Sequence, residues 1–310
     1  MSDTRPILIA GPTASGKSGL ALRLAEAIGG VIVNADSMQV YRELRILTAR
    51  PSVEEEARVP HALYGFVPAK ESYSAGRYAA DVARVLADIQ AAGQRAIIVG
   101  GTGLYFKALT EGLSPIPPVP EAVRTFWRTR AAAVGAPGMH AELAARDAAM
   151  AQRLAPTDMQ RIVRALEVLE ATGVSLADWQ RVPREPVLPL ADTIPLRVDI
   201  DRAQLYRRID RRFAAMMDAG AADEVLQLDR LGLDPGLPVC GALGVGPLRR
   251  FIAGEVSRET ALIEGQTETR QYAKRQITWA RSNMIAWRTL SAHEMEMSAE
   301  EFASFVQMAH

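Results

Sequence analysis

The sequence predicts an α/β fold, in which a parallel sheet carries a phosphate-binding loop (P-loop) and an all-helical subdomain is inserted. Three observations support this. The apolar segment Ile7–Ala10 leads into the octet Gly11–Ser18, which matches the pattern G-x-x-x-x-G-K-S and is followed by a helical pattern. A second apolar segment, Arg95–Val99, also leads into a glycine turn and a helix. The proline-rich stretch Ser114–Pro120 then separates this part of the chain from a helical one.

The octet has the features of a site that captures phosphate. Its glycines let the backbone curl so that N–H groups point inward, and the following helix adds partial positive charge at its N-terminus. Lys17 can reach a terminal phosphate, and the Ser18 hydroxyl can bind Mg²⁺. The predicted diphosphate-binding residues are Gly11, Thr13, Ala14, Ser15, Gly16, Lys17 and Ser18. We therefore expect a di- or triphosphate ligand.

The other core elements follow from apolar patterns and from the residues that end them. Val31–Asp36 is predicted to be a strand that ends in a carboxylate. Ligands of open α/β sheets bind at the carboxyl ends of the strands, so Asp36 should face the P-loop. A helix is predicted over Ala75–Ala92, ended by Gly93, and another over Leu104–Thr110. Strands that alternate with helices or long crossovers favour a parallel sheet.

The second half of the chain is predicted to be mainly helical. Helical patterns fill Glu121–Trp179, so we place the helical insertion at residues 114–190, between core segments 1–113 and 191–310. Pro195–Ile200 is a further predicted strand. Helices are expected over Asp201–Ala219 and Ala221–Leu231, near Pro247–Ile252, from Ser257 to about Ala286, and as one short amphipathic helix in the tail.

The composition excludes several classes of protein. No apolar run approaches the roughly 18 residues that a membrane span needs, and the polar start Met1–Arg5 leaves no room for a signal peptide. Cys240 is the only cysteine, which excludes internal disulfides and cysteine-rich metal sites, so we expect a cytoplasmic location. The formal net charge of zero gives no sign of nucleic-acid binding by itself, so an RNA-binding face requires basic residues gathered locally.

Two polar residues at predicted strand ends are candidate catalytic residues. Asp36 can act as a general base or bind Mg²⁺, or it can simply cap the backbone after Ser37. Thr102 can position Asp36 or an incoming nucleophile, or it can cap the helix that follows it. The strand Arg95–Val99 ends in glycines rather than in the Mg²⁺-sensing aspartate of motor and switch NTPases, which weakens the case for ATP hydrolysis.

A helix rich in arginine is the candidate phosphate clamp. Arg208 and Arg212 lie near one face of the predicted helix, where they could hold a distal phosphate. Arg207 and Arg211 lie near another face, where pairing with acids such as Asp210 or plain solvation is expected.

The most basic helix lies near the end of the chain. Arg270, Lys274 and Arg281 fall on one stripe of it, which suits a nucleic-acid backbone but is also typical of a solvated face. A weaker basic cluster, Gln160–Arg164, lies within the insertion.

These segments together resemble the tRNA dimethylallyltransferases, the tRNA isopentenyltransferase family. The resemblance is collinear from about residue 5 to residue 290 and includes Gly11–Ser18, Asn34–Tyr41, Val99–Leu109, Asp158–Val168, Arg208–Arg212 and Arg270–Gln276. It implies a nucleotide-kinase-like P-loop domain whose helical insertion contacts the anticodon stem-loop of tRNA.

The resemblance also implies a reaction. A dimethylallyl group moves from dimethylallyl diphosphate to N6 of adenosine 37 in tRNA, so the P-loop holds a diphosphate leaving group rather than ATP. Lys17, Arg208 or Arg212, and Mg²⁺ bound through Ser18 would stabilise that group. Asp36 would accept the proton with help from Thr102, and adenosine 37 would be flipped out of its stack. We expect a monomer with no membrane partner.

The tRNA contacts implied by the resemblance are Asp36, Ser37, Met38, Gln39, Thr102, Gln160, Arg161, Ile162, Val163, Arg164, Arg270, Lys274, Arg275 and Arg281. One segment departs from the family. Many members have Gly-Tyr-Arg before the last long helix, whereas residues 243–247 here read Leu-Gly-Val-Gly-Pro. No tRNA contact is therefore expected at the two replaced positions, and a variant anticodon-loop preference is possible.

Three alternative functions stay open. An adenylate isopentenyltransferase that uses free AMP, ADP or ATP would not need the insertion or Gln160–Arg164. A small-molecule kinase could use ATP at the same nucleotide-binding loop, but the additional helices would then have no role. A tRNA-binding module with a relic P-loop would not need to retain Lys17, Ser18 and Asp36.

Overall fold

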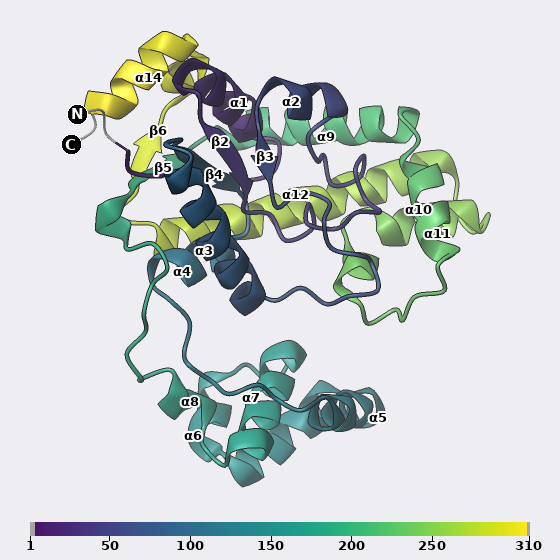
Figure 1. Cartoon of the computed structure of the whole chain (residues 1–310). Helices are drawn as coiled ribbons and strands as arrows, with labels where there is room; N and C mark the ends of the chain where they lie inside the picture. Colours follow the sequence, from purple (N-terminus) through teal and green to yellow (C-terminus); the bar gives the residue numbers. More distant parts are fainter. Residues whose placement is uncertain (1–3, 309–310) are drawn as a thin grey trace. The chain divides into compact units, whose positions relative to one another are not determined.

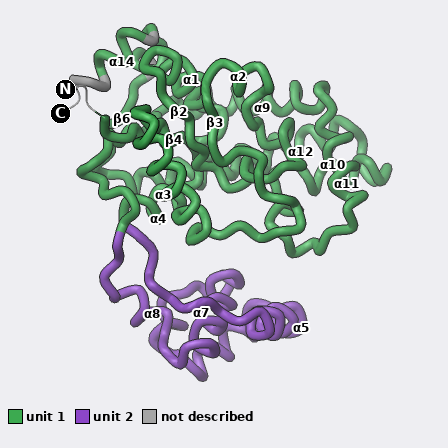
Figure 2. Tube along the Cα trace, in the orientation of Figure 1, with its two compact units in different colours: residues 1–111, 186–310 green, residues 112–185 purple. Residues whose placement is uncertain are grey.

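The computed structural model describes residues 4–308 and divides into two compact units. One consists of Met1–Glu111 and Pro186–His310, and the other of Gly112–Glu185 (Figure 2). The sequence places the insertion at 114–190, so its borders lie two and five residues further along the chain than those of the structure. Within the described residues, no helix is both long enough and apolar enough to cross a membrane.

The first unit is built on a six-stranded sheet of strand order β3-β2-β4-β1-β5-β6, in which all neighbours are parallel. Its strands are β1 (Ile7–Ala10), β2 (Val31–Asn34), β3 (His61–Ala62), β4 (Ala96–Gly100), β5 (Ile194–Val198) and β6 (Arg288–Leu290). The sequence predicts the four longer strands but misses β3 and β6. Two or three residues are too few to show a strand period.

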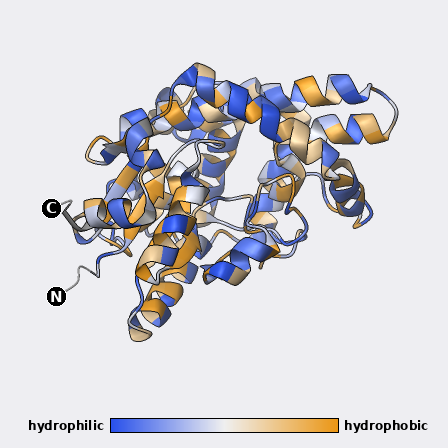
Figure 3. Cartoon of the chain, turned by 90° about the horizontal axis from the view of Figure 1, so that it is seen from above, coloured by the Kyte–Doolittle hydropathy of each residue, from blue (hydrophilic) through white to orange (hydrophobic). Residues whose placement is uncertain are grey.

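Helices cover both faces of this sheet (Figure 1). Successive side chains of a strand point to opposite faces, so Ile7 and Ile9 pack on one side, with α1 (Lys17–Ile28) and α14 (Ala299–Met308). Leu8 packs on the other side, with α3 (Ala75–Ala91) and α4 (Gly103–Thr110). The bands of hydrophilic and hydrophobic residues along the helices in Figure 3 reflect this one-sided burial.

The C-terminal half adds the helices that complete the first unit. These are α9 (Arg202–Asp218), α10 (Ala221–Asp229), α11 (Val245–Ile252) and α12 (Arg258–Asn283). Two short helices were not predicted, α2 (Val53–Arg58) and α13 (Ala292–Glu296). Each begins with a capping box, formed by Ser52 with Glu55 and by Ser291 with Glu294. The tail therefore holds two helices instead of the single one expected.

The second unit is entirely helical and has its own core. Its helices are α5 (Glu121–Arg146), α6 (Ala148–Arg153), α7 (Met159–Thr172) and α8 (Leu176–Trp179). Trp127, Leu143 and Ile162 are among the buried residues of this core. Gly135 interrupts α5 with a φ of 69°, two residues before Pro137, so α5 is two helical segments joined at a kink.

Contact between Phe213 and Gly265 predicts a measurable stability difference. A Cβ atom at position 265 would lie 2.0 Å from Cζ of the buried Phe213 ring, so Gly265→Ala should destabilise the protein by about 1–3 kcal/mol through overpacking. The matched control is Gly246→Ala in α11, where a Cβ atom meets nothing within 4 Å. We expect thermal unfolding to show a lower Tm for the first variant and an unchanged or slightly higher Tm for the second. Equal Tm values for both would contradict this packing.

Candidate active site

The turn between β1 and α1 has the curled backbone that the octet predicts. Ala14 and Gly16 are left-handed, with φ values of 64° and 93°. The backbone N–H of Ser15 donates to the Pro12 carbonyl at 3.3 Å, and α1 begins at Lys17. The Ser15 hydroxyl is buried and has no hydrogen-bond partner among the described residues. A buried group of this kind at a helix N-terminus suits an anion-binding turn.

Two arginines of α9 reach this turn. Arg208 Nη1 donates to the Ser15 carbonyl at 3.3 Å, and Arg212 Nη2 donates to Thr13 Oγ1. The helical spacing predicted that these two side chains share a face. Asp210, expected to pair with the arginines of the other face, instead forms a salt bridge with Arg270 of α12. Of the two alternatives for Arg207 and Arg211, pairing with Asp210 is therefore wrong, whereas solvation agrees with the structure, in which both side chains are exposed.

Lys17 lies beside the same two arginines. Its ammonium donates to the Pro12 carbonyl at 3.2 Å. The pKa of Lys17 is lowered to about 8, mainly by burial; Asp36 opposes this shift and Arg212 adds to it. A cavity of about 340 Å³ is lined by Gly16, Lys17, Ser18, Arg208 and Arg212, among others. The groups predicted to hold phosphate therefore face one space.

Asp36 occupies a turn that is fixed from two sides. The Asn34 side chain accepts from the Asp36 backbone N–H at 2.8 Å and donates to the Asp36 carbonyl at 3.0 Å. Asp36 Oδ1 accepts from the Met38 backbone N–H at 2.9 Å. Thr102 Oγ1 accepts from the Ser37 N–H at 2.9 Å and makes no capping bond to α4. Of its two predicted roles, Thr102 therefore supports the Asp36 turn.

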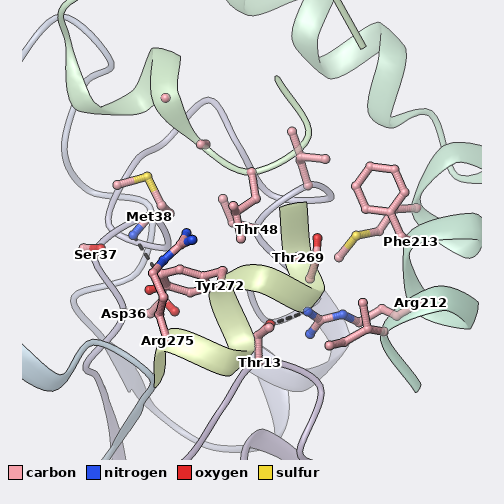
Figure 4. Close-up of a pocket in the computed structure, with 16 residues that line it drawn as sticks. Thr13, Asp36, Ser37, Met38, Thr48, Arg212, Phe213, Thr269, Tyr272 and Arg275 are labelled. Atoms are coloured by element: carbon pink, nitrogen blue, oxygen red, sulfur yellow. Dashed lines mark hydrogen bonds between the residues drawn. The ribbon is translucent and has the colours of Figure 1, made fainter. Parts of the chain in front are cut away.

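A second cavity, of about 250 Å³, joins the Asp36 turn to the P-loop (Figure 4). Arg212 and its partner Thr13 lie on one side of it, and Asp36, Tyr272 and Arg275 lie together on another. Because Arg212 lines both cavities, a ligand held at the P-loop can extend toward Asp36. This is an arrangement for group transfer from a phosphate-bearing donor.

Gln276 is an anchoring residue that sequence reasoning missed. Its Oε1 accepts from the Thr13 N–H and its Nε2 donates to the Gly101 carbonyl, both at 2.9 Å. One side chain of α12 therefore ties both glycine turns together. Gly101 and Gly103 permit this approach, because Cβ atoms there would lie 2.2 Å from Gln276 Nε2 and from the Trp279 ring. The sequence does contain a signal for Gln276, because it lies in the segment Arg270–Gln276 that resembles the family. Only the charged residues of that segment were predicted to have a role.

Tyr272 is a second residue of α12 that the sequence argument passed over. It lines the cavity with Asp36 and also a further hollow that includes Thr102. Burial, with Asp36 nearby, raises the pKa of the Tyr272 hydroxyl above its ordinary value. The hydroxyl therefore stays protonated and can donate a hydrogen bond beside the carboxylate.

Apart from Asp36 and Thr102, which line the cavities described above, the predicted tRNA contacts of the first unit divide into three groups. Ser37, Met38 and Arg275 line the Asp36 cavity. Lys274 and Arg281 are exposed beside a separate hollow. Two others are engaged within the protein. Gln39 Nε2 donates to the carbonyls of Thr48 and Ala49 at 2.9 and 3.0 Å, and Arg270 is held by Asp210.

The predicted contacts of the second unit are mostly on its surface. Gln160 and Arg161 are exposed. Arg164 is partly buried and pairs with Glu167 at 3.7 Å, and Val163 is also partly buried. Ile162 has no exposed surface and belongs to the core of this unit. Its prediction as a tRNA contact was wrong, because a fully buried side chain cannot touch RNA.

The residues at the P-loop fit a phosphate-bound Mg²⁺ ion but not a metal held by protein alone. In the described part of the chain, no group of three or more His, Cys, Asp or Glu could hold a metal ion. Ser18 is exposed in the first turn of α1 and lines the phosphate cavity. Mg²⁺ in such sites takes one or two protein ligands and several phosphate or water oxygens.

Comparisons with known proteins agree with this geometry. The family model for IPP transferase matches residues 39–283, and that for isopentenyl transferase matches residues 5–63. The chain is 52% identical to the tRNA dimethylallyltransferase of Parvibaculum lavamentivorans over 97% of this chain and 96% of that protein. The chain belongs to the family of tRNA dimethylallyltransferases. A second member, from Bradyrhizobium sp. BTAi1, is 54% identical over 90% of this chain and 92% of its own.

Solved structures of the dimethylallyltransferase family share the fold. The tRNA isopentenylpyrophosphate transferase of Bacillus halodurans is 28% identical, with a TM-score of 0.68 over 99% of this chain and 96% of its own. A eukaryotic dimethylallyltransferase described as acting on tRNA is 25% identical, with a TM-score of 0.80 over 96% of this chain and 77% of its own. The predicted fold class and family are thus confirmed, and this dimethylallyltransferase family member is a transferase.

The lowered pKa of Lys17 predicts a cost in stability that ligand binding offsets. Lys17 has an ordinary pKa of 10.5 but about 8 in the folded protein. The unfolded chain therefore binds more protons between these values, so stability rises with pH across that window. Lys17→Met removes the buried charge and should raise the Tm of the ligand-free protein below about pH 8, with the gain fading toward about pH 10.5. The same variant should lose binding of the diphosphate donor.

The control for that prediction is Lys70→Met, which removes an exposed ammonium. Its Tm should match that of the parent protein at every pH. A Lys17→Met variant that is less stable than the parent near neutral pH would contradict the argument.

Proposed function

We propose that the protein transfers a dimethylallyl group from dimethylallyl diphosphate to N6 of adenosine 37 in tRNA and releases diphosphate. The single observation that carries this proposal is that Asp36 and Arg212 line one cavity while Arg212 also lines the P-loop cavity. This geometry supports a base at Asp36 and a leaving-group site at Arg212 and the P-loop, on two sides of one space. Membership in the tRNA dimethylallyltransferase family supports the choice of donor and of tRNA as acceptor.

The donor's diphosphate is assigned to the P-loop. As the bond between C1 and oxygen breaks, its electron pair leaves with the diphosphate, whose negative charge increases. Backbone N–H groups of the turn, Lys17, Arg208 and Arg212 stabilise that charge. Donor binding also favours the charged form of Lys17, whose pKa is low in the ligand-free protein. Ser18 would help to hold a Mg²⁺ ion at this site, and the ion would supply further charge neutralisation.

The acceptor's N6 is assigned to the Asp36 side of the cavity. Its lone pair forms the new bond to C1, and the proton that N6 then loses passes to the Asp36 carboxylate. Asn34 and Thr102 fix the turn that carries Asp36, so the base is held in place before substrate arrives. A base stacked within an RNA loop cannot reach such a cavity, so adenosine 37 is flipped out to react.

The exposed basic residues of α12 are assigned to the tRNA backbone. Lys274, Arg275 and Arg281 are exposed, and Arg275 also lines the reaction cavity. Phosphate contacts of this kind supply affinity and position the RNA. We also propose that the enzyme is a monomer. We place the enzyme in the cytoplasm, the expectation from its single, buried free cysteine.

A second candidate is transfer to a free adenine nucleotide. It is favoured by the match of residues 5–63 to the isopentenyl transferase model. That match stops before the helical unit begins at Gly112, which a free nucleotide leaves without a role.

A transfer assay decides between these functions. The protein, Mg²⁺ and labelled dimethylallyl diphosphate are incubated with a tRNA that carries A37, the same tRNA with G37, or free AMP. We expect label only in the A37 tRNA. Label in AMP would establish the second candidate, and absence of label from every acceptor would contradict the proposed donor.

Asp36→Asn tests the assigned base. It removes the negative charge but keeps the size of the side chain, so kcat should fall by about 10²- to 10⁴-fold while the KM values change little. The matched control is Asp88→Asn, the same chemical change at an exposed position of α3. An Asp36→Asn enzyme with the parent kcat would exclude Asp36 as the base.

A further inference from the structure

We propose that Leu47, held in place by Glu224, sets the length of the prenyl chain that the site accepts. This inference rests on the proposed function and deepens it, because it assigns the residue that excludes donors longer than the dimethylallyl group. It also assigns Glu224 as a positioning residue.

The Asp36 cavity is lined by both polar and apolar side chains. The polar residues include Thr13 and Arg212 on one side and Asp36 on another. The apolar residues that line the cavity are Met38, Leu47, Ile209, Phe213, Met216, Ala242 and Leu243. In Figure 4, Phe213 lies across the cavity from Asp36 and Tyr272. A donor whose diphosphate is held at Arg212 gains most by placing its hydrocarbon chain against these apolar walls.

Leu47 lies in a loop whose backbone is fixed by one carboxylate. Glu224 Oε1 accepts from the N–H groups of Arg45 at 2.5 Å and Ile46 at 2.9 Å. Glu224 Oε2 accepts from the N–H of Leu47 itself at 2.9 Å. Three successive backbone donors of the loop therefore converge on one side chain of α10. Hydrogen bonds to a charged acceptor are stronger than neutral ones, so this contact holds the loop firmly.

The backbone around Leu47 is also held by hydrogen bonds of the Gln39 and Thr48 side chains. The Gln39 amide donates to the carbonyls of Thr48 and Ala49, and Thr48 Oγ1 donates to the Leu44 carbonyl at 2.7 Å. Ala49 is left-handed, with a φ of 52°. A non-glycine residue persists in that conformation only where its surroundings impose it. The backbone on both sides of Leu47 therefore has little freedom to move.

The side chains of Leu47 and Phe213 both pack against Gly244. A Cβ atom at Gly244 would lie 3.1 Å from Leu47 Cδ1 and 2.8 Å from Phe213 Cε2, so both side chains press against this glycine. Gly265 contacts the Phe213 ring from α12 in the same way. The N–H of Gly244 donates to Glu268 Oε2 at 3.0 Å, which fixes that backbone too. Neither side chain can retreat without displacing backbone.

A rigid apolar wall discriminates by chain length. A five-carbon group fits in front of it, whereas a ten-carbon group requires that Leu47 or Phe213 be displaced. Hydrophobic pockets discriminate about 10- to 200-fold per methylene in such cases. Shortening Leu47 should therefore extend the pocket, and loosening the loop by changing Glu224 should do the same in part.

The experiment compares two donors, dimethylallyl diphosphate and geranyl diphosphate, with one A37 tRNA. The measured quantity is the ratio of kcat/KM for geranyl to that for dimethylallyl diphosphate. Leu47→Ala should raise this ratio at least about tenfold. Leu47→Met, which keeps the side-chain volume, should leave it near the parent value. Glu224→Gln replaces one of the two acceptor oxygens with an NH₂ group, which cannot accept from the three loop N–H groups. It should raise the ratio by a smaller factor than Leu47→Ala does.

Two controls separate the proposed role from general destabilisation. Asp223→Asn makes the matched charge change at an exposed position of α10 and should leave the ratio unchanged. Unfolding temperatures are measured for every variant, and Leu47→Val replaces Leu47→Ala if the latter does not fold. A merely structural role of Glu224 would lower Tm without moving the ratio of the two donors.

Several results would overturn this inference. A folded Leu47→Ala enzyme with the parent ratio would exclude Leu47 as the determinant of length. A raised KM for tRNA with an unchanged ratio would mean that the apolar wall at Leu47 contacts the adenine instead of the prenyl chain. Glu224→Gln with an unchanged ratio would exclude the positioning role. These outcomes are distinct from failure of the proposed function, in which the parent enzyme itself does not transfer the dimethylallyl group to tRNA.

Discussion

The two hydrogen bonds of the Gln276 amide are the contact on which the active site depends. One bond reaches the P-loop at Thr13, and the other reaches the turn after β4 at Gly101. They hold α12 against both turns, at a distance that only glycine at positions 101 and 103 allows. The same helix then places Tyr272 and Arg275 beside Asp36. The cavity that joins the P-loop to Asp36 exists because this helix packs so closely.

The electrostatics of the site follow from that closeness. Lys17 and Arg212 are both partly desolvated near one another, and burial lowers the pKa of each. Asp36 offsets part of this by raising both pKa values. A cluster with more positive than negative charge is costly in the free protein and favourable once a diphosphate is bound. The cost in stability is a consequence of the binding function, as is common at active sites.

The parts of the site that depend on local sequence could be predicted, and those that depend on tertiary contacts could not. The curl at Ala14 and Gly16 and the shared face of Arg208 and Arg212 follow from glycine spacing and helical period. The clamp of Glu224 on residues 45–47 spans about 180 positions of the chain, and no pattern within either segment reveals it. The short strand β3 likewise forms because β2 pairs with it, whereas α2 begins with a capping box that the local sequence carries.

Some residues that the sequence suggests as tRNA contacts have structural roles in the fold. Ile162 lies in a basic segment but fills the core of the helical unit. Gln39 lies next to the Asp36 turn, but its amide donates to the carbonyls of Thr48 and Ala49 and so fixes that loop. Arg270 lies on the basic stripe, yet Asp210 holds it. A basic or polar side chain identifies a region of interest, and only its partners show what it does.

The central claim is that one cavity holds the diphosphate at Lys17 and Arg212 and the acceptor nitrogen at Asp36. A crystal structure of the protein with an unreactive thio analogue of dimethylallyl diphosphate and an anticodon stem-loop carrying A37 tests it most directly. The account predicts diphosphate oxygens on the P-loop N–H groups, Lys17 and Arg212, with the flipped adenine N6 within hydrogen-bond distance of Asp36. An adenine bound away from Asp36, or a diphosphate bound outside the P-loop, would contradict it.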